Sequence, residues 1–263
     1  MPDHRDLRRM AVTIGEFQRG FALAGKDGRV IERPGVVASV CPAIGFRSIF
    51  NAAAYTDAGD LGTTLPELRS EWESAAVNAW GVWAPAGDED AAALLTDAGL
   101  KIDSSPMAMA ASVDAIAKPE GGVSVEPASD LTELDAVLAG AYDFPPGVIV
   151  YAFPDLVERF RCSVARDESG EAMAALATAE ADGDLGFTMV GTRPEARGRG
   201  FASELMRQAV AAAAERGCTT TSLQASAMGH GVYARLGYED LGAYHLWEHR
   251  TPAPWEQEER AAE

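Results

Sequence analysis

One segment restricts the fold of this chain more than any other, namely residues 190–202 with the sequence VGTRPEARGRGFA. An apolar run over residues 185–192 predicts a strand before the turn, and an alanine-rich run after it predicts a helix. Gly198 and Gly200 let the backbone approach a ligand closely, and the first N–H groups of a helix lack an intrahelical acceptor. With the helix dipole added, the turn is predicted to cradle an anion, most naturally a pyrophosphate. The alternative is a tight strand-to-helix connection that holds no ligand.

The rest of the C-terminal half alternates predicted strands and helices, which is typical of a mixed α/β fold. Further strands are predicted at residues 123–126, 161–164, 172–179, 219–225 and 243–249. Helices are predicted from Ser129 onward and at residues 154–160, 201–216 and 231–236. In the helix at 201–216, Phe201 and Leu205 begin an apolar stripe at i, i+4 spacing, so we expect one face of this helix to pack on a sheet.

A second motif, YARLGY at residues 233–238, follows on another predicted helix. Together with the glycine-rich turn, and in this order, it resembles the GNAT superfamily of acyl-CoA-dependent N-acetyltransferases over residues 123–250. The resemblance implies a mixed, mainly antiparallel sheet flanked by helices. It also implies acetyl-CoA as the acyl donor and direct transfer of the acetyl group to a primary amine of a small molecule or peptide. Propionyl or longer acyl donors are not excluded.

The same resemblance assigns the contacts to the acyl donor to the end of the strand and to the turn. The matching positions are Met189, Val190, Thr192, Arg197, Gly198, Arg199, Gly200, Phe201 and Ala202. One backbone amide of the strand would hydrogen-bond the thioester carbonyl, although the sequence does not show which amide does so. The arginine side chains either reach the phosphates or face solvent.

Tyr233 falls where this family often places its general acid. A tyrosine with its ordinary pKa near 10 is protonated at pH 7 and can protonate a departing thiolate. The alternative is a core tyrosine whose hydroxyl is bonded to a carbonyl. No general base is assigned, because Glu180, Asp182, Glu195 and His230 are each explained as solvated surface groups, and a water relay serves as well. The aromatic stretches at residues 142–144 and 151–153, with Asp143, form a plausible amine pocket or local core.

The N-terminal half repeats part of this order, with helices predicted at residues 65–79 and 88–97 and strands at residues 80–83 and 107–113. An offset of 138 residues superimposes Gly62 on Gly200, Leu95 on Tyr233 and Gly99 on Gly237 without a gap. We interpret this as two similar domains in tandem, although strand–helix repeats can also align by accident. Residues 59–64, which match the glycine-rich turn, contain no arginine and carry the acidic Asp60. Leu95 stands at the position that matches Tyr233. The N-terminal domain is therefore predicted to lack the cofactor motif and to wall the acceptor cleft, form an interface or act as a scaffold.

Proline, two glycines and charge at residues 118–122 mark the linker between the domains. The predicted division is residues 1–118 for the degenerate GNAT-like domain, 123–250 for the acetyltransferase domain and 251–263 for a tail.

Composition excludes several classes of function. Forty acidic against 22 basic residues give a net charge of −18, which disfavours nucleic acid and anionic membranes and suits either a cationic acceptor or simple solubility. The chain has no apolar run of membrane-spanning length and no signal-peptide pattern, and its three cysteines are widely spaced, so a cytoplasmic protein without a metal is expected. The oligomeric state is open, a homodimer included. The alternative functions are a non-catalytic acyl-CoA-binding or regulatory module and a protein–protein scaffold.

Overall fold

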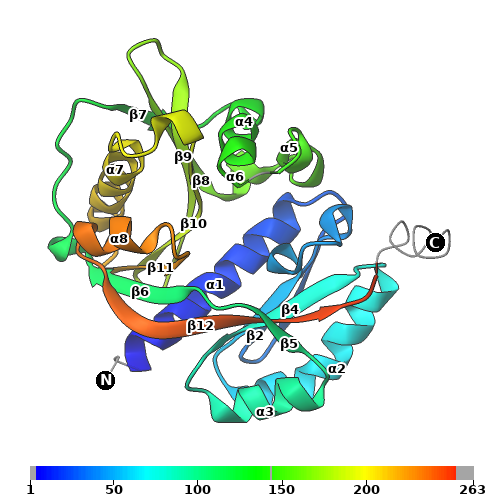
Figure 1. Ribbon diagram of the computed structural model, residues 1–263. Helices are drawn as coiled ribbons and strands as arrows, with labels where there is room; N and C mark the ends of the chain where they lie inside the picture. Colours follow the sequence, from blue (N-terminus) through cyan, green and yellow to red (C-terminus); the bar gives the residue numbers. More distant parts are fainter. Residues whose placement is uncertain (1–3, 143, 253–263) are drawn as a thin grey trace.

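The structure of the chain is a computed structural model that describes residues 4–142 and 144–252 (Figure 1). Its strands are β1 (Arg29–Arg33), β2 (Val36–Val40), β3 (Ala52–Tyr55), β4 (Ala79–Pro85), β5 (Lys101–Ser104), β6 (Met107–Ser112), β7 (Ser124–Pro127), β8 (Arg161–Arg166), β9 (Ala172–Ala181), β10 (Asp184–Thr192), β11 (Thr220–Ala225) and β12 (Glu239–Arg250). Its α-helices are α1 (His4–Ala24), α2 (Ala58–Ser74), α3 (Glu89–Asp97), α4 (Leu131–Tyr142), α5 (Val148–Ala152), α6 (Leu156–Arg159), α7 (Phe201–Glu215) and α8 (His230–Leu236). Short 3-10 turns are η1 (Pro42–Ile44), η2 (Ser48–Phe50), η3 (Val113–Ala115) and η4 (Pro194–Ala196).

The described strands join one sheet in the order β1-β2-β3-β4-β12-β6-β11-β10-β9-β8-β7, and β5 pairs with β12 outside this path. Their pairings are antiparallel except for β3 with β4 and β10 with β11, which are parallel. Helices α2 and α3 pack on the part of the sheet built by the N-terminal half, and α7 and α8 pack on the other part (Figure 1). The predicted mixed, mainly antiparallel sheet with flanking helices is confirmed.

The two halves of the chain exchange strands at the centre of the sheet. β6 comes from the N-terminal half but lies between β11 and β12. β12 pairs with β6 through residues 239–243 and with β4 through residues 244–250. The change of partner follows a register shift next to Gly242, whose φ of +110° is readily adopted only by glycine. Each half therefore supplies a strand that the other half needs.

The element order of one half recurs in the other. In the first half β3 is followed by α2, β4 and α3, and in the second half β10 is followed by α7, β11 and α8. The parallel pair occupies the same place in both series. The structure thus contains two similar units, as the offset of 138 residues predicts.

Helix α1, for which the sequence predicted no element, lies between the two halves (Figure 1). One face packs on β10, where a Cβ added to Gly186 would stand 2.1 Å from Cγ2 of Thr13 and 2.6 Å from Cζ of Phe17. The opposite face packs on β2, where a Cβ on Gly15 would lie 3.5 Å from Cβ of Val37. Glycines on both the helix and the strand make this close approach possible.

Some predicted boundaries are wrong for identifiable reasons. The predicted turn at residues 59–64 is helical, because the carboxylate of Asp57 accepts the N–H groups of Gly59 (2.9 Å) and Asp60 (3.1 Å) and starts α2 earlier than expected. Helix α2 also ends at Ser74 rather than at residue 79.

The helix predicted from Ser129 begins at Leu131, since Oδ1 of Asp130 accepts the N–H of Thr132 at 2.8 Å. Helix α5 was not predicted, and α6 is shorter than the predicted helix at residues 154–160.

The predicted linker, residues 118–122, runs between η3 and β7 and is attached to α7. The buried carboxylate of Glu204 accepts the N–H groups of Glu120 at 3.0 Å and of Gly121 at 3.1 Å. Residues 253–263 of the predicted tail lie outside the described residues. Within the described ranges, no helix combines the length and apolar character needed to cross a membrane.

Candidate functional site

The parallel strands β10 and β11 separate where the candidate site begins. Their pairing covers only residues 184–186 of β10 with residues 220–222 of β11. Further along β10, the register with β9 shifts between Thr188 and Gly191, so that Met189 and Val190 have no partner residue in β9. Met189 has a φ of +54°, an unusual value for a residue with a side chain. Strained backbone of this kind, costing about 1–3 kcal/mol, is concentrated at functional sites.

The predicted strand residues do not all lie in this bulge. Met189 packs against the core beside α1, and Val190 packs against the core beneath α7. Thr192 has already returned to the ladder, where it lies opposite Ala174. On the edge of β10 that faces β11, all three residues lie beyond the paired residues 184–186, so backbone contact with a ligand is open to each of them.

The glycine-rich turn presents free N–H groups at the start of α7. Gly198 and Gly200 have φ values of +77° and +87°, and Gly200 is the N-cap without a side-chain cap. Among the described residues, the N–H groups of Gly198, Gly200, Phe201 and Ala202 have no hydrogen-bond acceptor. A Cβ built on either glycine would meet no atom within 4 Å. The turn is therefore an open cradle, while the buried ring of Phe201 anchors the helix to the core.

The two arginines of the turn make different contacts. Arg197 donates from Nη2 to the carbonyl oxygen of Ala141 at 3.4 Å, which ties the turn to the end of α4. The guanidinium of Arg199 lies 5.1 Å from the ring centre of Phe201. Both side chains are exposed at the rim of the cradle and add positive charge there.

Tyr233 lies near the start of α8, and its ring folds back over Gly229. A Cβ on Gly229 would stand 2.8 Å from Cε2 of Tyr233, so this position of the ring depends on glycine. Burial raises the pKa of Tyr233 to about 12, so its hydroxyl is protonated at neutral pH. Within the described part of the chain, that hydroxyl has no hydrogen-bond partner, whereas the hydroxyl of nearby Tyr238 is bonded to Thr221 at 2.9 Å. Tyr238 is thus a core tyrosine with a bonded hydroxyl, which is the role that the sequence leaves open as the alternative for Tyr233.

Tyr142 is a site residue whose role the sequence did not indicate. Its hydroxyl donates a hydrogen bond of 2.7 Å to the carbonyl oxygen of Val190 in the bulge. Although the side chain is partly exposed, burial around the hydroxyl raises the pKa of Tyr142 above its usual range, and the neighbouring Tyr233 adds to this. The end of α4 and the start of α8 therefore bring the two tyrosines near each other.

The predicted aromatic pocket is only partly assembled. Tyr142 stacks on Phe144 with ring centres 5.8 Å apart, and the guanidinium of Arg47 lies 5.2 Å from the centre of Phe144. Arg47 belongs to the N-terminal half, which in this way reaches the predicted acceptor side. Tyr151 is exposed, Phe153 is fully buried in the core, and Asp143 lies outside the described residues.

Two of the groups considered as a base lie away from the candidate site. Glu180 is bonded to Arg216, and Asp182 occupies the turn between β9 and β10, both at the opposite end of β10 from the bulge. Nε2 of His230 lies 2.8 Å from Oδ1 of Asp240 on β12.

Glu195 is exposed beside Arg193. Within the described ranges, no group of three or more histidine, cysteine or carboxylate side chains could hold a metal ion.

The corresponding helix start in the N-terminal half has no open cradle. The carboxylate of Asp57 already takes the N–H groups of Gly59 and Asp60, and a bound anion would be repelled there. Leu95, at the position matching Tyr233, is fully buried.

Comparisons with known proteins agree with this architecture. Residues 158–240 match the family model described as an acetyltransferase (GNAT) domain. A GCN5-related N-acetyltransferase from Kribbella flavida is 20% identical with a TM-score of 0.61, and the match covers 94% of this chain and 96% of that one. A GCN5-related N-acetyltransferase from Sphaerobacter thermophilus is 19% identical with a TM-score of 0.53, and the match covers 86% of this chain and 77% of that one. A tandem GNAT protein from the clavulanic acid biosynthesis pathway is 13% identical with a TM-score of 0.52, and the match covers 92% of this chain and 96% of that one. No curated protein matches the chain. At these sequence identities, the similarity to the three solved structures shows the fold alone.

Proposed function

We propose that this protein is an acetyl-CoA-dependent N-acetyltransferase, because residues 158–240 match the model of a GNAT acetyltransferase domain and the fold is similar to that of a tandem GNAT protein. Its acceptor is a primary amine of a small molecule or peptide. The C-terminal half carries the activity, and the N-terminal half supports it without binding acetyl-CoA itself.

The open cradle at the start of α7 is the observation that carries this proposal. Its N–H groups lack acceptors among the described residues, and the space above Gly198 and Gly200 is clear. Helix N-termini of this form bind phosphate groups through N–H donors and the helix dipole. The residues present therefore fit the diphosphate of coenzyme A, with Arg197 and Arg199 adding positive charge in a chain of net charge −18.

Bound acetyl-CoA would supply a thioester whose acetyl group passes to the amine nitrogen. The unpaired backbone at Met189 and Val190 offers a place where an N–H can stabilise negative charge on a carbonyl oxygen. Tyr142 holds this bulge in position through the carbonyl of Val190. Tyr233 holds the proton that a departing thiolate requires, since its pKa is raised to about 12.

The state of the cysteines supports direct transfer without an acyl-enzyme. Cys41, Cys162 and Cys218 are all buried. Burial raises the pKa of Cys41 and of Cys162 to about 12 and raises the pKa of Cys218 as well, so none is present as a nucleophilic thiolate at neutral pH.

Calorimetric titration with acetyl-CoA, together with an assay of thiol release across a panel of amines, tests the proposal. Gly200→Ala places a methyl group in the cradle at a φ of +87° and should weaken acetyl-CoA binding at least tenfold. Gly170→Ala is a matched control, because Gly170 has a φ of +86° and equally open surroundings in the β8–β9 turn.

Equal affinity in the wild type and Gly200→Ala would contradict the cradle. Binding without any thiol release, unchanged in Tyr233→Phe, would instead identify a non-catalytic acyl-CoA-binding module.

A further inference from the structure

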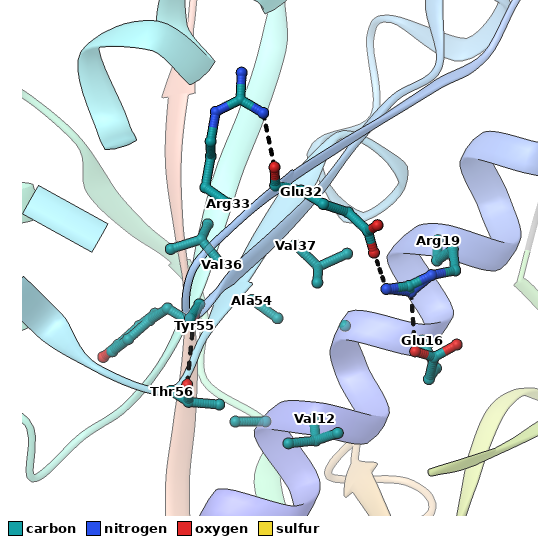
Figure 2. A pocket seen from close by; sticks show the side chains of 13 residues that line it. Val12, Glu16, Arg19, Glu32, Arg33, Val36, Val37, Ala54, Tyr55 and Thr56 are labelled. Carbon is teal, nitrogen blue, oxygen red and sulfur yellow. Dashed lines mark hydrogen bonds and ion pairs between the residues drawn. The ribbon is translucent and has the colours of Figure 1, made fainter. Parts of the chain in front are cut away.

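A cavity of about 360 Å³ lies in the N-terminal half, between α1 and strands β1–β3 (Figure 2). Its sides are mainly apolar, with Val12 from α1, Val37 from β2 and Ala54 from β3. It is separate from the cradle of α7 and from both tyrosines of the candidate site.

The position of α1 explains why this space is open. Thr13 and Phe17 hold one face of the helix against β10, and Gly15 on another face contacts Val37 without a side chain of its own. Because a single helix has to cover strands of both halves, its flank toward the β1–β2 hairpin is left partly uncovered. The hairpin turn carries Gly35 at a φ of +67° and forms the rim.

One end of the cavity has an excess of negative charge. Nη1 of Arg19 lies 3.0 Å from Oε1 of Glu16, and its Nη2 is bonded to Oε1 of Glu32 (Figure 2). Two carboxylates therefore share one guanidinium. As far as the chain is described, Oε2 of each glutamate accepts no hydrogen bond. The other nearby cation, Arg33, is neutralised by Glu67 outside the cavity, with Nε 3.0 Å from Oε2.

We propose that this cavity binds a small organic cation. The ammonium group lies beside Glu16 and Glu32, where it meets the two open carboxylate oxygens. An apolar body of one ring lies against Val12, Val37 and Ala54. A cavity of about 150 Å³ suffices for benzene, so about 360 Å³ accommodates a ring together with a charged side arm. The site does not depend on the proposed transferase function, because it uses none of the same residues.

Titration with benzylamine in the absence of acetyl-CoA, followed by methyl NMR, tests the proposal. We expect the methyl signals of Val12 and Val37 to shift with a Kd on the order of 1 mM or tighter. Phenylacetate, which has a similar body but opposite charge, and methylammonium, which has the head group alone, should bind at least tenfold more weakly. Failure of acetyl-CoA to bind elsewhere would refute the transferase proposal and leave this result intact.

Two variants locate the binding. Glu16→Gln combined with Glu32→Gln should weaken benzylamine binding at least tenfold, whereas Glu168→Gln, an exposed glutamate of the β8–β9 turn, should have no effect. If the double variant does not fold, Val12→Phe fills the cavity from α1 and should abolish the shifts at Val37. The proposal is overturned if phenylacetate binds as well as benzylamine, if the shifts lie outside the cavity, or if no binding occurs up to about 10 mM.

Discussion

Tyr142 and Val190 are joined by a hydrogen bond of 2.7 Å from the tyrosine hydroxyl to the valine carbonyl oxygen. This bond connects the end of α4 to the bulge of β10. The next residue, Gly191, allows the contact, because a Cβ there would stand 2.8 Å from Cβ of Ala141. Helix α4 thus lies directly on the strand and positions the backbone that is proposed to contact the acyl group.

Replacing Tyr142 by phenylalanine leaves the carbonyl of Val190 without this donor. A neutral hydrogen bond contributes about 1 kcal/mol, so we expect kcat to fall about fivefold through loss of order in the bulge. Tyr151→Phe is the control, since Tyr151 is 58% exposed and should tolerate the change. Steady-state kinetics of both variants measure the effect, and equal kcat values would show that Tyr142 does not position the bulge.

Tyr233→Phe removes the proposed proton donor while keeping the ring. General acid catalysis contributes about 100-fold or more, so kcat should fall by at least that factor while the Kd for acetyl-CoA stays unchanged. Tyr238→Phe breaks the bond to Thr221 instead and should lower the melting temperature with little effect on kcat. If Tyr233→Phe keeps the wild-type kcat, Tyr233 is not the general acid, and the departing thiolate takes its proton from solvent.

The pKa of Tyr233 also predicts the alkaline side of the pH–rate profile. A general acid must be protonated, and burial raises the pKa of this hydroxyl to about 12, so the acid form persists well above pH 10. We therefore expect kcat to show no alkaline decrease between about pH 8 and pH 10.5. A decrease near pH 9–10 that disappears in Tyr233→Phe would mean that the hydroxyl titrates normally.

Asp184 at the base of β10 should make stability depend on pH. Its buried carboxyl has a raised pKa, mainly because of desolvation, although the hydroxyls of Thr13, Thr220 and Ser222 bond to it and oppose the shift. The folded state therefore keeps this proton at pH values where the unfolded chain has lost it. Stability must then fall as pH rises from about 4 through the folded pKa.

Urea unfolding of the wild type and of Asp184→Asn at a series of pH values from 4 to 7 checks this. The free energy of unfolding of the variant, relative to that of the wild type, should increase with pH and then level off. A difference that is the same at every pH would show that the carboxyl titrates alike in both states.

The exchange of strands predicts that neither half folds alone. Without residues 1–118, β11 loses its neighbour β6 and β12 loses β4, so long edges of unpaired backbone are exposed. We expect each fragment alone to give a poorly dispersed NMR spectrum, and the two expressed together to restore the spectrum of the intact chain. A dispersed spectrum from residues 119–263 alone would contradict this.

Most of the order of elements after residue 64 could be read from the sequence because its signals are local. Apolar periodicity along residues 201–216 and the glycine that follows are sufficient to predict α7, whose observed bounds are Phe201–Glu215. The same holds for β10 and for the glycines of the turn, whose positive φ values follow from residue type. The roles given to the turn and to Tyr233 stay predictions, which the geometry supports.

Helix α1, the exchanged strands and the partner of Tyr142 could not be read in this way. Thr13 contacts Asp184 across 171 residues, and β12 changes partner within one strand, so no local pattern records either relation.

By itself, then, the sequence determined most helices and strands after residue 64 and the place where the backbone can present free N–H groups, since both follow from residue type and spacing within a few residues. Only the tertiary structure decided that Tyr142 holds the bulge, that α1 joins the halves and that β12 pairs with both β6 and β4. These depend on which distant surfaces pack together, and packing is selected by the free energy of the whole fold rather than by any single segment.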